Sequence, residues 1–167
     1  MPSGDDLTDL IISAQAGDQT AWDALVERFT PFVWSVARGH GLTQATAADV
    51  VQTAWLRLVE SLPHVTGESV GSWLARTART ESVQALLWSD PRVDRRPRSA
   101  AGSDTVWDVV DSLPARTRLA LRVLATDPPP TDAELASALD IEPDETAEVV
   151  ASSLRRLSDA LPTHSTI

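Results

Sequence analysis

The chain has 167 residues, of which 24 are acidic and 14 basic, so its net charge is −10 at pH 7, and it contains no cysteine. The absence of cysteine excludes a disulfide framework, a thiolate metal site and a cysteine nucleophile. The negative charge argues against a non-specific nucleic-acid binder, because such proteins gain affinity from Lys and Arg on phosphates. Any contact with DNA must therefore be local.

Two further features of the composition bear on fold and location. Hydrophobic residues make up 43% of the chain and charged residues 23%, which is ordinary for a protein with a packed core. The longest apolar runs are far too short to cross a membrane, and the start, MPSGDDLTDL, has acids where a signal peptide would carry basic residues. We expect a folded, cytoplasmic protein with no membrane segment.

Apolar residues at helical spacing predict four helices in the first half of the chain. The first carries Leu7 and Ile11 and ends at Gly17-Asp18. The second continues through Pro31, where we expect a kink, to Gly39. The third has the widest apolar stripe: Val50, Val51, Ala54, Trp55, Leu58, Val59 and Leu62. After a turn rich in Pro and Gly, the fourth places Val70, Trp73, Leu74, Thr77 and Ala78 inward.

The stretch from Ser89 to Ser103 interrupts this pattern. It reads SDPRVDRRPRSAAGS, with two prolines, four arginines and one large apolar residue. Such a composition predicts a flexible linker.

The second half predicts a smaller helical unit that ends in a helix-turn-helix. Pro114 suits the first turn of a helix, and Asp127-Pro-Pro-Pro stops it. Thr131 and Glu134 have the spacing of a capping box, and Asp140 marks a tight turn. The last helix opens at Pro143 and is expected to turn these residues inward: Val150, Leu154, Leu157 and Leu161.

The predicted fold is therefore all-α, with two small helical domains joined by a linker. The domains are expected at 1–88 and 105–162, the linker at 89–104 and a frayed tail at 163–167.

Catalysis finds little support in the sequence. His40, His64 and His164 fall in predicted loops or the tail, and none is paired with a carboxylate at metal-ligand spacing. No Gly-rich phosphate loop or nucleophile motif is present. We expect no catalytic residue, no metal site and no cofactor.

The chain has six tryptophans and no tyrosine, which is an unusual composition. Exposed aromatic rings can stack on unpaired bases, so some of these tryptophans are candidate contacts to nucleic acid. Three of them fall on apolar stripes and are expected in the core: Trp22, Trp55 and Trp107. Trp73 and Trp88 flank the segment that carries Arg76 and Arg79, three residues apart on an exposed helix flank.

Three segments of the chain resemble known sequence motifs. Asp49-Val-Val-Gln-Thr-Ala-Trp-Leu-Arg-Leu58 is similar to a helix of the pattern "D-[LV]-[VT]-Q-[ED]-x-[FW]". Ser72-Trp-Leu-Ala-Arg-Thr-Ala-Arg79 resembles "W-L-x-x-I-A-R-N", and Leu113-Pro-Ala-Arg-Thr-Arg-Leu119 resembles "L-P-x-R-x-R-x". In this order and spacing, over almost the whole chain, they resemble the extracytoplasmic-function (ECF) sigma factors of bacterial RNA polymerase.

The resemblance implies sigma region 2 in the first domain and region 4 in the second, with core RNA polymerase (its clamp helices and flap) and promoter DNA as partners. It also allows for an anti-sigma factor. The implied clamp contacts are the positions outside the apolar stripe: Asp49, Gln52, Thr53 and Arg57.

The same resemblance implies that the melted minus-ten element lies on the turn after Pro63 and on the start of the next helix, with a flipped base in a pocket. Arg76 and Arg79 would meet backbone phosphates. The other candidate residues are His64, Thr66, Glu68, Ser69, Ser72 and Trp73. After Arg79 the sequence departs from the family, with Thr80, Gln84, Leu87 and Trp88 where Asn, Asp and basic residues are usual.

The recognition helix departs further. Its usual basic positions are Ala147, Val149 and Ser152, and its leading end carries Asp144, Glu145 and Glu148. Acids repel phosphates, although near a helix N-terminus they also stabilise the helix. Ser152, Arg155 and Arg156 remain as doubtful DNA contacts, so we expect weak or absent reading of the minus-thirty-five element.

Three functions stay open at this point. The first is a divergent sigma factor, and the second is a sigma-like module that binds polymerase or a regulatory protein without initiating transcription. The third, a freestanding helix-turn-helix regulator, is disfavoured by its acidic recognition helix.

Overall fold

The structure is a computed structural model that describes residues 4–88 and 106–161. Within these ranges every regular element is a helix and there is no strand, which confirms the predicted all-α class. The predicted linker, 89–104, and the tail, 163–167, lie outside the described residues.

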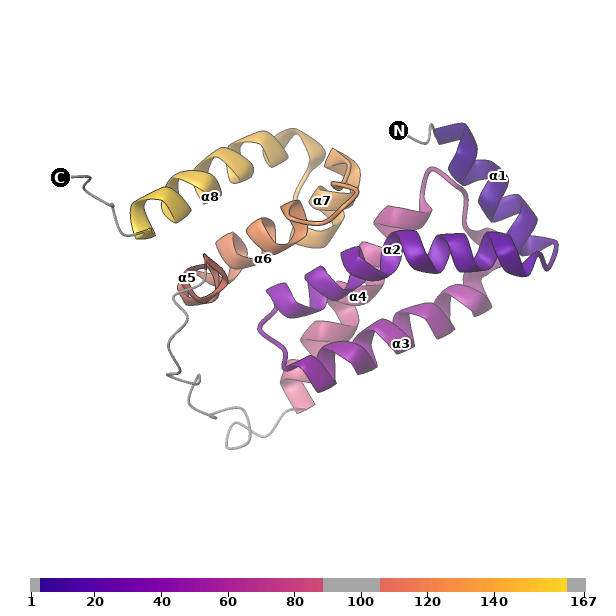
Figure 1. Ribbon diagram of the computed structural model, residues 1–167, viewed down its shortest axis with the longest axis horizontal. Helices are drawn as coiled ribbons and strands as arrows, with labels where there is room; N and C mark the ends of the chain where they lie inside the picture. Colours follow the sequence, from indigo (N-terminus) through magenta and orange to yellow (C-terminus); the bar gives the residue numbers. More distant parts are fainter. Residues whose placement is uncertain (1–3, 89–105, 162–167) are drawn as a thin grey trace.

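The first half folds into four long helices, as predicted (Figure 1). They are α1 (Gly4–Gln15), α2 (Gln19–Gly39), α3 (Gln44–Ser61) and α4 (Val70–Trp88), with a short 3-10 turn, η1 (Leu62–His64), between α3 and α4. Asp18 caps α2 by accepting the Thr20 amide at 2.8 Å, and Gly17 supplies the positive φ of 90° that the preceding turn needs. Helix α2 continues through Pro31 without a break in helical structure.

The second half contains α5 (Val106–Ser112), α6 (Ala115–Leu124), α7 (Asp132–Leu139), η2 (Pro143–Glu145) and α8 (Thr146–Ala160). The predicted capping box opens α7: Thr131 Oγ1 accepts the Glu134 amide at 3.2 Å, and the Glu134 carboxylate accepts the Thr131 amide at 2.8 Å. Asp140 ends α7 in the left-handed conformation, with φ 57°. The turn expected at Asp140 is therefore present.

The two halves pack against each other through α2 and α6 and through α4 and α7 (Figure 1). A single apolar cluster joins the halves, with Val36 and Leu74 from the first and Leu119, Val123 and Leu139 from the second. Helix α8 packs on α6 and lies on its far side from the first four helices. The arrangement leaves α8 at the periphery and places α6 and α7 between it and the first half.

Gly39 allows the closest approach between the halves. A Cβ atom at this position would lie 2.9 Å from the Cα atom of Leu119 and 2.5 Å from its Cδ1, so any larger residue would displace α6. The Arg118 Nε–H donates to the Gly39 carbonyl at 2.9 Å, which satisfies an acceptor at the end of α2.

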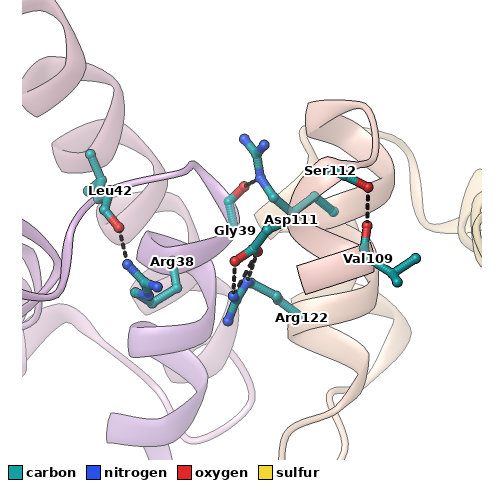
Figure 2. A network of polar contacts seen from close by, with 8 residues as sticks. Arg38, Gly39, Leu42, Val109, Asp111, Ser112 and Arg122 are labelled. Carbon is teal, nitrogen blue, oxygen red and sulfur yellow. Dashed lines mark hydrogen bonds and ion pairs between the residues drawn. The ribbon is translucent and has the colours of Figure 1, made fainter. Parts of the chain in front are cut away.

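A polar network borders this contact (Figure 2). Arg122 of α6 forms a forked pair with Asp111 of α5, at 2.7 and 2.9 Å from one guanidinium nitrogen. Arg38 of α2 lies near this pair, and its guanidinium donates to the Leu42 carbonyl. Burial and the nearby Arg122 lower the pKa of Arg38, while Asp111 opposes the shift. Asp111 thus pairs with Arg122 and offsets part of the repulsion between Arg122 and Arg38.

Three predictions of buried side chains are wrong. Trp107 is 44% exposed, because α5 buries only Val110 and the indole lies instead beneath the Arg122 guanidinium, 5.1 Å from the ring centroid. Leu154 is 51% exposed, since α8 turns Thr146 and Ser153 inward. Val59 is also exposed, because α3 buries a narrower stripe: Ala47, Val50, Ala54 and Leu58.

Trp22 and Trp55 do pack against the core, although both are only partly buried. Their rings meet edge to face with centroids 5.8 Å apart. This pairing joins α2 to α3 and accounts for two of the six tryptophans without a ligand.

Candidate functional site

The outer surface of α3 carries the four residues assigned to a polymerase contact. Asp49, Gln52 and Arg57 are exposed, and Thr53 is half-buried. Arg57 is not free, because its guanidinium pairs with Glu81 of α4 at 2.8 Å. The sequence alone did not indicate Glu81 as part of this surface.

A groove separates α3 from the end of α4. It has a volume of about 340 Å³, and residues from both helices line it, including Asp49, Thr53, Glu81 and Trp88. Two of these are assigned polymerase contacts, whereas Glu81 and Trp88 come from the part of α4 where the chain departs from the sigma pattern. The assigned surface on α3 therefore continues onto α4.

The turn between α3 and α4 holds four of the residues assigned to the minus-ten element. His64, Thr66 and Glu68 are exposed, and Ser69 is half-buried. Thr66 and Ser69 bond to each other: the Thr66 amide donates to Ser69 Oγ at 3.1 Å, and the two hydroxyls lie 2.9 Å apart. Their hydrogen-bonding groups are partly used within the turn.

Helix α1 packs against this turn and fixes its conformation. The Gln15 side-chain amide donates to the carbonyls of Leu62 at 2.8 Å and Val65 at 3.2 Å. Gly67 lies so close to Thr8 that a Cβ atom there would be 2.4 Å from the Thr8 backbone nitrogen. The turn is thus fixed by contacts that the sequence did not reveal, since Gln15 and Thr8 carry no motif.

Helix α4 divides its assigned residues between two environments. Ser72 and Trp73 are half-buried, and Arg76 is exposed. Arg79, which we expected on the same exposed flank, is instead half-buried and pairs with Asp140 at the end of α7 at 2.6 Å. The expectation is wrong because α7 packs along this side of α4, a contact between halves that helix periodicity cannot indicate.

His40 lies beside that ion pair, at the end of α2. It lines a cavity of about 530 Å³ together with Arg79, Leu119 and Asp140. Desolvation by burial, and next Arg118 and Arg79, lower the pKa of His40, because an imidazolium here would lose hydration and face two cations. The neutral imidazole is the form that this junction favours.

The elements assigned to the minus-thirty-five element, η2 and α8, expose both acidic and basic side chains. Arg155 and Arg156 lie exposed on α8, and the Ser152 hydroxyl donates to the Val149 carbonyl at 3.0 Å. At the leading end, Glu145 accepts the Glu142 amide at 3.0 Å, so one of the acids there stabilises η2. Asp144 and Glu148 are exposed.

The described residues hold neither a metal-binding cluster nor a membrane-spanning helix. Residues 4–88 and 106–161 contain no group of three or more His, Asp or Glu side chains arranged to hold a metal ion. In the same ranges no helix has the length and low charge needed to cross a bilayer.

A family model and a solved structure are similar to this chain. Residues 25–87, from the first half of α2 almost to the end of α4, match the family model of Sigma-70 region 2. The solved structure of CnrH in complex with the cytosolic domain of CnrY has a similar fold, with a TM-score of 0.68. The two chains are 19% identical, and the alignment covers 95% of this chain and 98% of that chain. No curated protein matches the sequence significantly.

Proposed function

We propose that this protein is an ECF-type sigma factor that directs core RNA polymerase to promoters mainly through its first domain. The observation that carries the proposal is the region 2 match, which spans α3, the following turn and α4. These elements bear the exposed Asp49, Gln52 and Arg76, so the proposed polymerase-facing and DNA-facing residues lie on the matched helices.

The proposed division of labour has α3 dock on the clamp helices while the turn and α4 receive the melted minus-ten strand. Arg76 is the exposed cation of α4 and is suited to a phosphate. His64, Thr66 and Glu68 are exposed at the turn and offer polar groups to an unpaired base.

Reconstitution with core polymerase tests this function. Wild-type protein should yield promoter-dependent transcripts, and Asp49→Ala with Gln52→Ala should weaken polymerase binding without unfolding the protein, because both side chains are exposed. Unchanged affinity in that double variant would contradict the docking assignment.

We further propose that the second domain reads the minus-thirty-five element weakly or not at all. Support comes from the exposed Asp144 and Glu148 at the leading end of the recognition helix, where they would repel phosphates. Footprinting tests this: sequence-specific protection at that element, abolished by Arg155→Ala with Arg156→Ala, would refute it.

A second candidate function is a sigma-like module that binds polymerase or a regulatory protein without initiating transcription. The Arg79–Asp140 pair favours it, because this contact ties an assigned phosphate-binding residue to the second domain. The similar chain CnrH was solved bound to the cytosolic domain of CnrY, which makes a protein partner for this fold reasonable here too. Stable polymerase binding without promoter-dependent transcripts would select this candidate.

A further inference from the structure

We propose that the groove between α3 and α4 is a pocket for a basic side chain on a helix of core RNA polymerase, and that Trp88 anchors it. This inference rests on the proposed polymerase binding and extends it to α4. It assigns a function to Trp88, a position where the chain departs from the family pattern, and places Glu81 in the wall of the pocket.

The first support is the exposure of the tryptophan. Trp88 is 88% exposed at the end of α4, although burying an indole from water is favourable. Trp88 is one of the residues that line the groove of about 340 Å³. Large aromatic residues beside a pocket are typical of the few residues that dominate the binding energy of an interface.

The second support is the charge of the groove. Asp49 stands on one wall and Glu81 on the other. Arg57 neutralises Glu81 through their pair at 2.8 Å. Asp49 forms no ion pair with any residue in 4–88 or 106–161, so its carboxylate is available to a cation from outside.

Together these walls select the chemistry of the occupant. A guanidinium or ammonium entering the groove would meet the Asp49 carboxylate and could lie on the Trp88 face, which attracts cations through its quadrupole. The long apolar stem of Arg or Lys would contact the ring and Ala85. A DNA phosphate is disfavoured by the Asp49 carboxylate, which is unpaired among the described residues, and a second copy of a chain with net charge −10 is disfavoured by repulsion.

The position of the groove identifies which partner supplies that side chain. Asp49 and Thr53 belong both to the groove and to the α3 surface proposed to dock on the clamp helices. A helix lying along α3 would therefore pass the mouth of the groove. The pocket and the clamp contact form one continuous surface.

The experiment compares two adjacent residues in the full-length protein by measuring the dissociation constant for core polymerase. Trp88→Ala should weaken binding about thirtyfold, the size expected for an aromatic residue that dominates an interface, and Trp88→Phe should retain most of the affinity. Leu87→Ala is the matched control, because Leu87 is 78% exposed but does not line the groove. It should change affinity less than about threefold, as expected for a residue outside the dominant cluster.

A double-mutant cycle then tests the shared occupant. Asp49→Asn and Trp88→Ala should be non-additive, because each removes part of the same pocket. Equal binding by Trp88→Ala and wild type, or equal losses in Trp88→Ala and Leu87→Ala, would overturn this inference while leaving polymerase binding intact. Failure of the wild-type protein to bind core polymerase would overturn the proposed function and this inference with it.

Discussion

The packing of the two halves affects the charge state of His40. Its imidazole faces Arg118 and Arg79, with Arg116 and Asp140 lining the adjoining cavities. The ordinary pKa of histidine is 6.5, and the folded value lies below it. Between these two values the unfolded chain binds more protons than the folded chain, so folding stability falls as pH falls.

We therefore expect acidification to destabilise the wild-type protein partly through this residue. The contribution is fully present above pH 6.5 and is lost as pH decreases from there toward the folded pKa. His40→Gln should lose less melting temperature than wild type between pH 7.5 and 5.5, as measured by circular dichroism. His64→Gln, at an exposed position, is the control and should behave as wild type does. Parallel pH profiles for His40→Gln and wild type would contradict this account.

Arg76 and Arg79 lie one turn apart on α4 but differ in what they can offer to DNA. Arg76 is exposed, whereas Arg79 is paired with Asp140 at 2.6 Å. In a complex with core polymerase, Arg76→Ala should weaken promoter DNA binding and reduce the salt slope by about 1, the effect of one lost phosphate contact.

Removing the partner of Arg79 should have the opposite effect. Asp140→Asn removes the negative charge that holds Arg79 and should raise the affinity for DNA, as measured in the same salt titration. The gain should vanish in an Arg79→Ala background, because no guanidinium is then released. A gain that persists in that background would mean that Asp140 repels DNA directly.

At the scale of helices, the contact between α4 and α7 depends on one glycine. A Cβ atom at Gly71 would lie 1.8 Å from Glu134 Oε1, and Glu134 is held in place because its other oxygen accepts the Thr131 amide at 2.8 Å. Gly71→Ala should therefore displace Glu134 and cost about 1 kcal/mol or more through the lost cap and the steric conflict.

The sign of this effect should reverse when Glu134 is removed. In a Glu134→Ala background the space is free, and Gly71→Ala should stabilise α4 by up to about 1 kcal/mol, the helix propensity difference between the two residues. Urea unfolding of the four proteins of this cycle measures both effects. The same loss in both backgrounds would show that the close approach does not restrict residue 71.

The helices also show which parts of the structure can be predicted from the sequence. The capping box at Thr131 and the turn at Asp140 were predicted because their signals are local. The inner face of α8 was predicted with Leu154 inside, yet Ser153 is buried and Leu154 exposed. Apolar periodicity reports which residues could be buried, but the neighbouring helices decide which of them are.

Tertiary contacts limit the prediction of the candidate site from sequence in the same way. Asp49, Gln52 and Arg76 are exposed as predicted, since their exposure follows from the periodicity of one helix. The capture of Arg79 by Asp140 depends on residues 61 positions apart, and no local pattern encodes it. The small residues Gly71, Ala75 and Ala78 on α4 were a usable signal, because small side chains permit close helix packing.

At the scale of the whole molecule, the shared core predicts that the two halves unfold together. Leu119 of the second half is buried against Gly39 of the first, and both halves contribute to one apolar cluster. Truncating Leu119 should therefore lower the stability of helices that contain no altered residue.

Tryptophan fluorescence provides the probe, because five of the six tryptophans precede residue 89. Leu119→Ala should cost about 2–5 kcal/mol, the usual range for a buried leucine, and should shift the fluorescence midpoint in urea as much as the circular dichroism midpoint. Val110→Ala is a second test, since Val110 is buried within the second half and outside the shared cluster. If the halves unfolded independently, Val110→Ala would leave the fluorescence transition in place while splitting the dichroism transition into two steps.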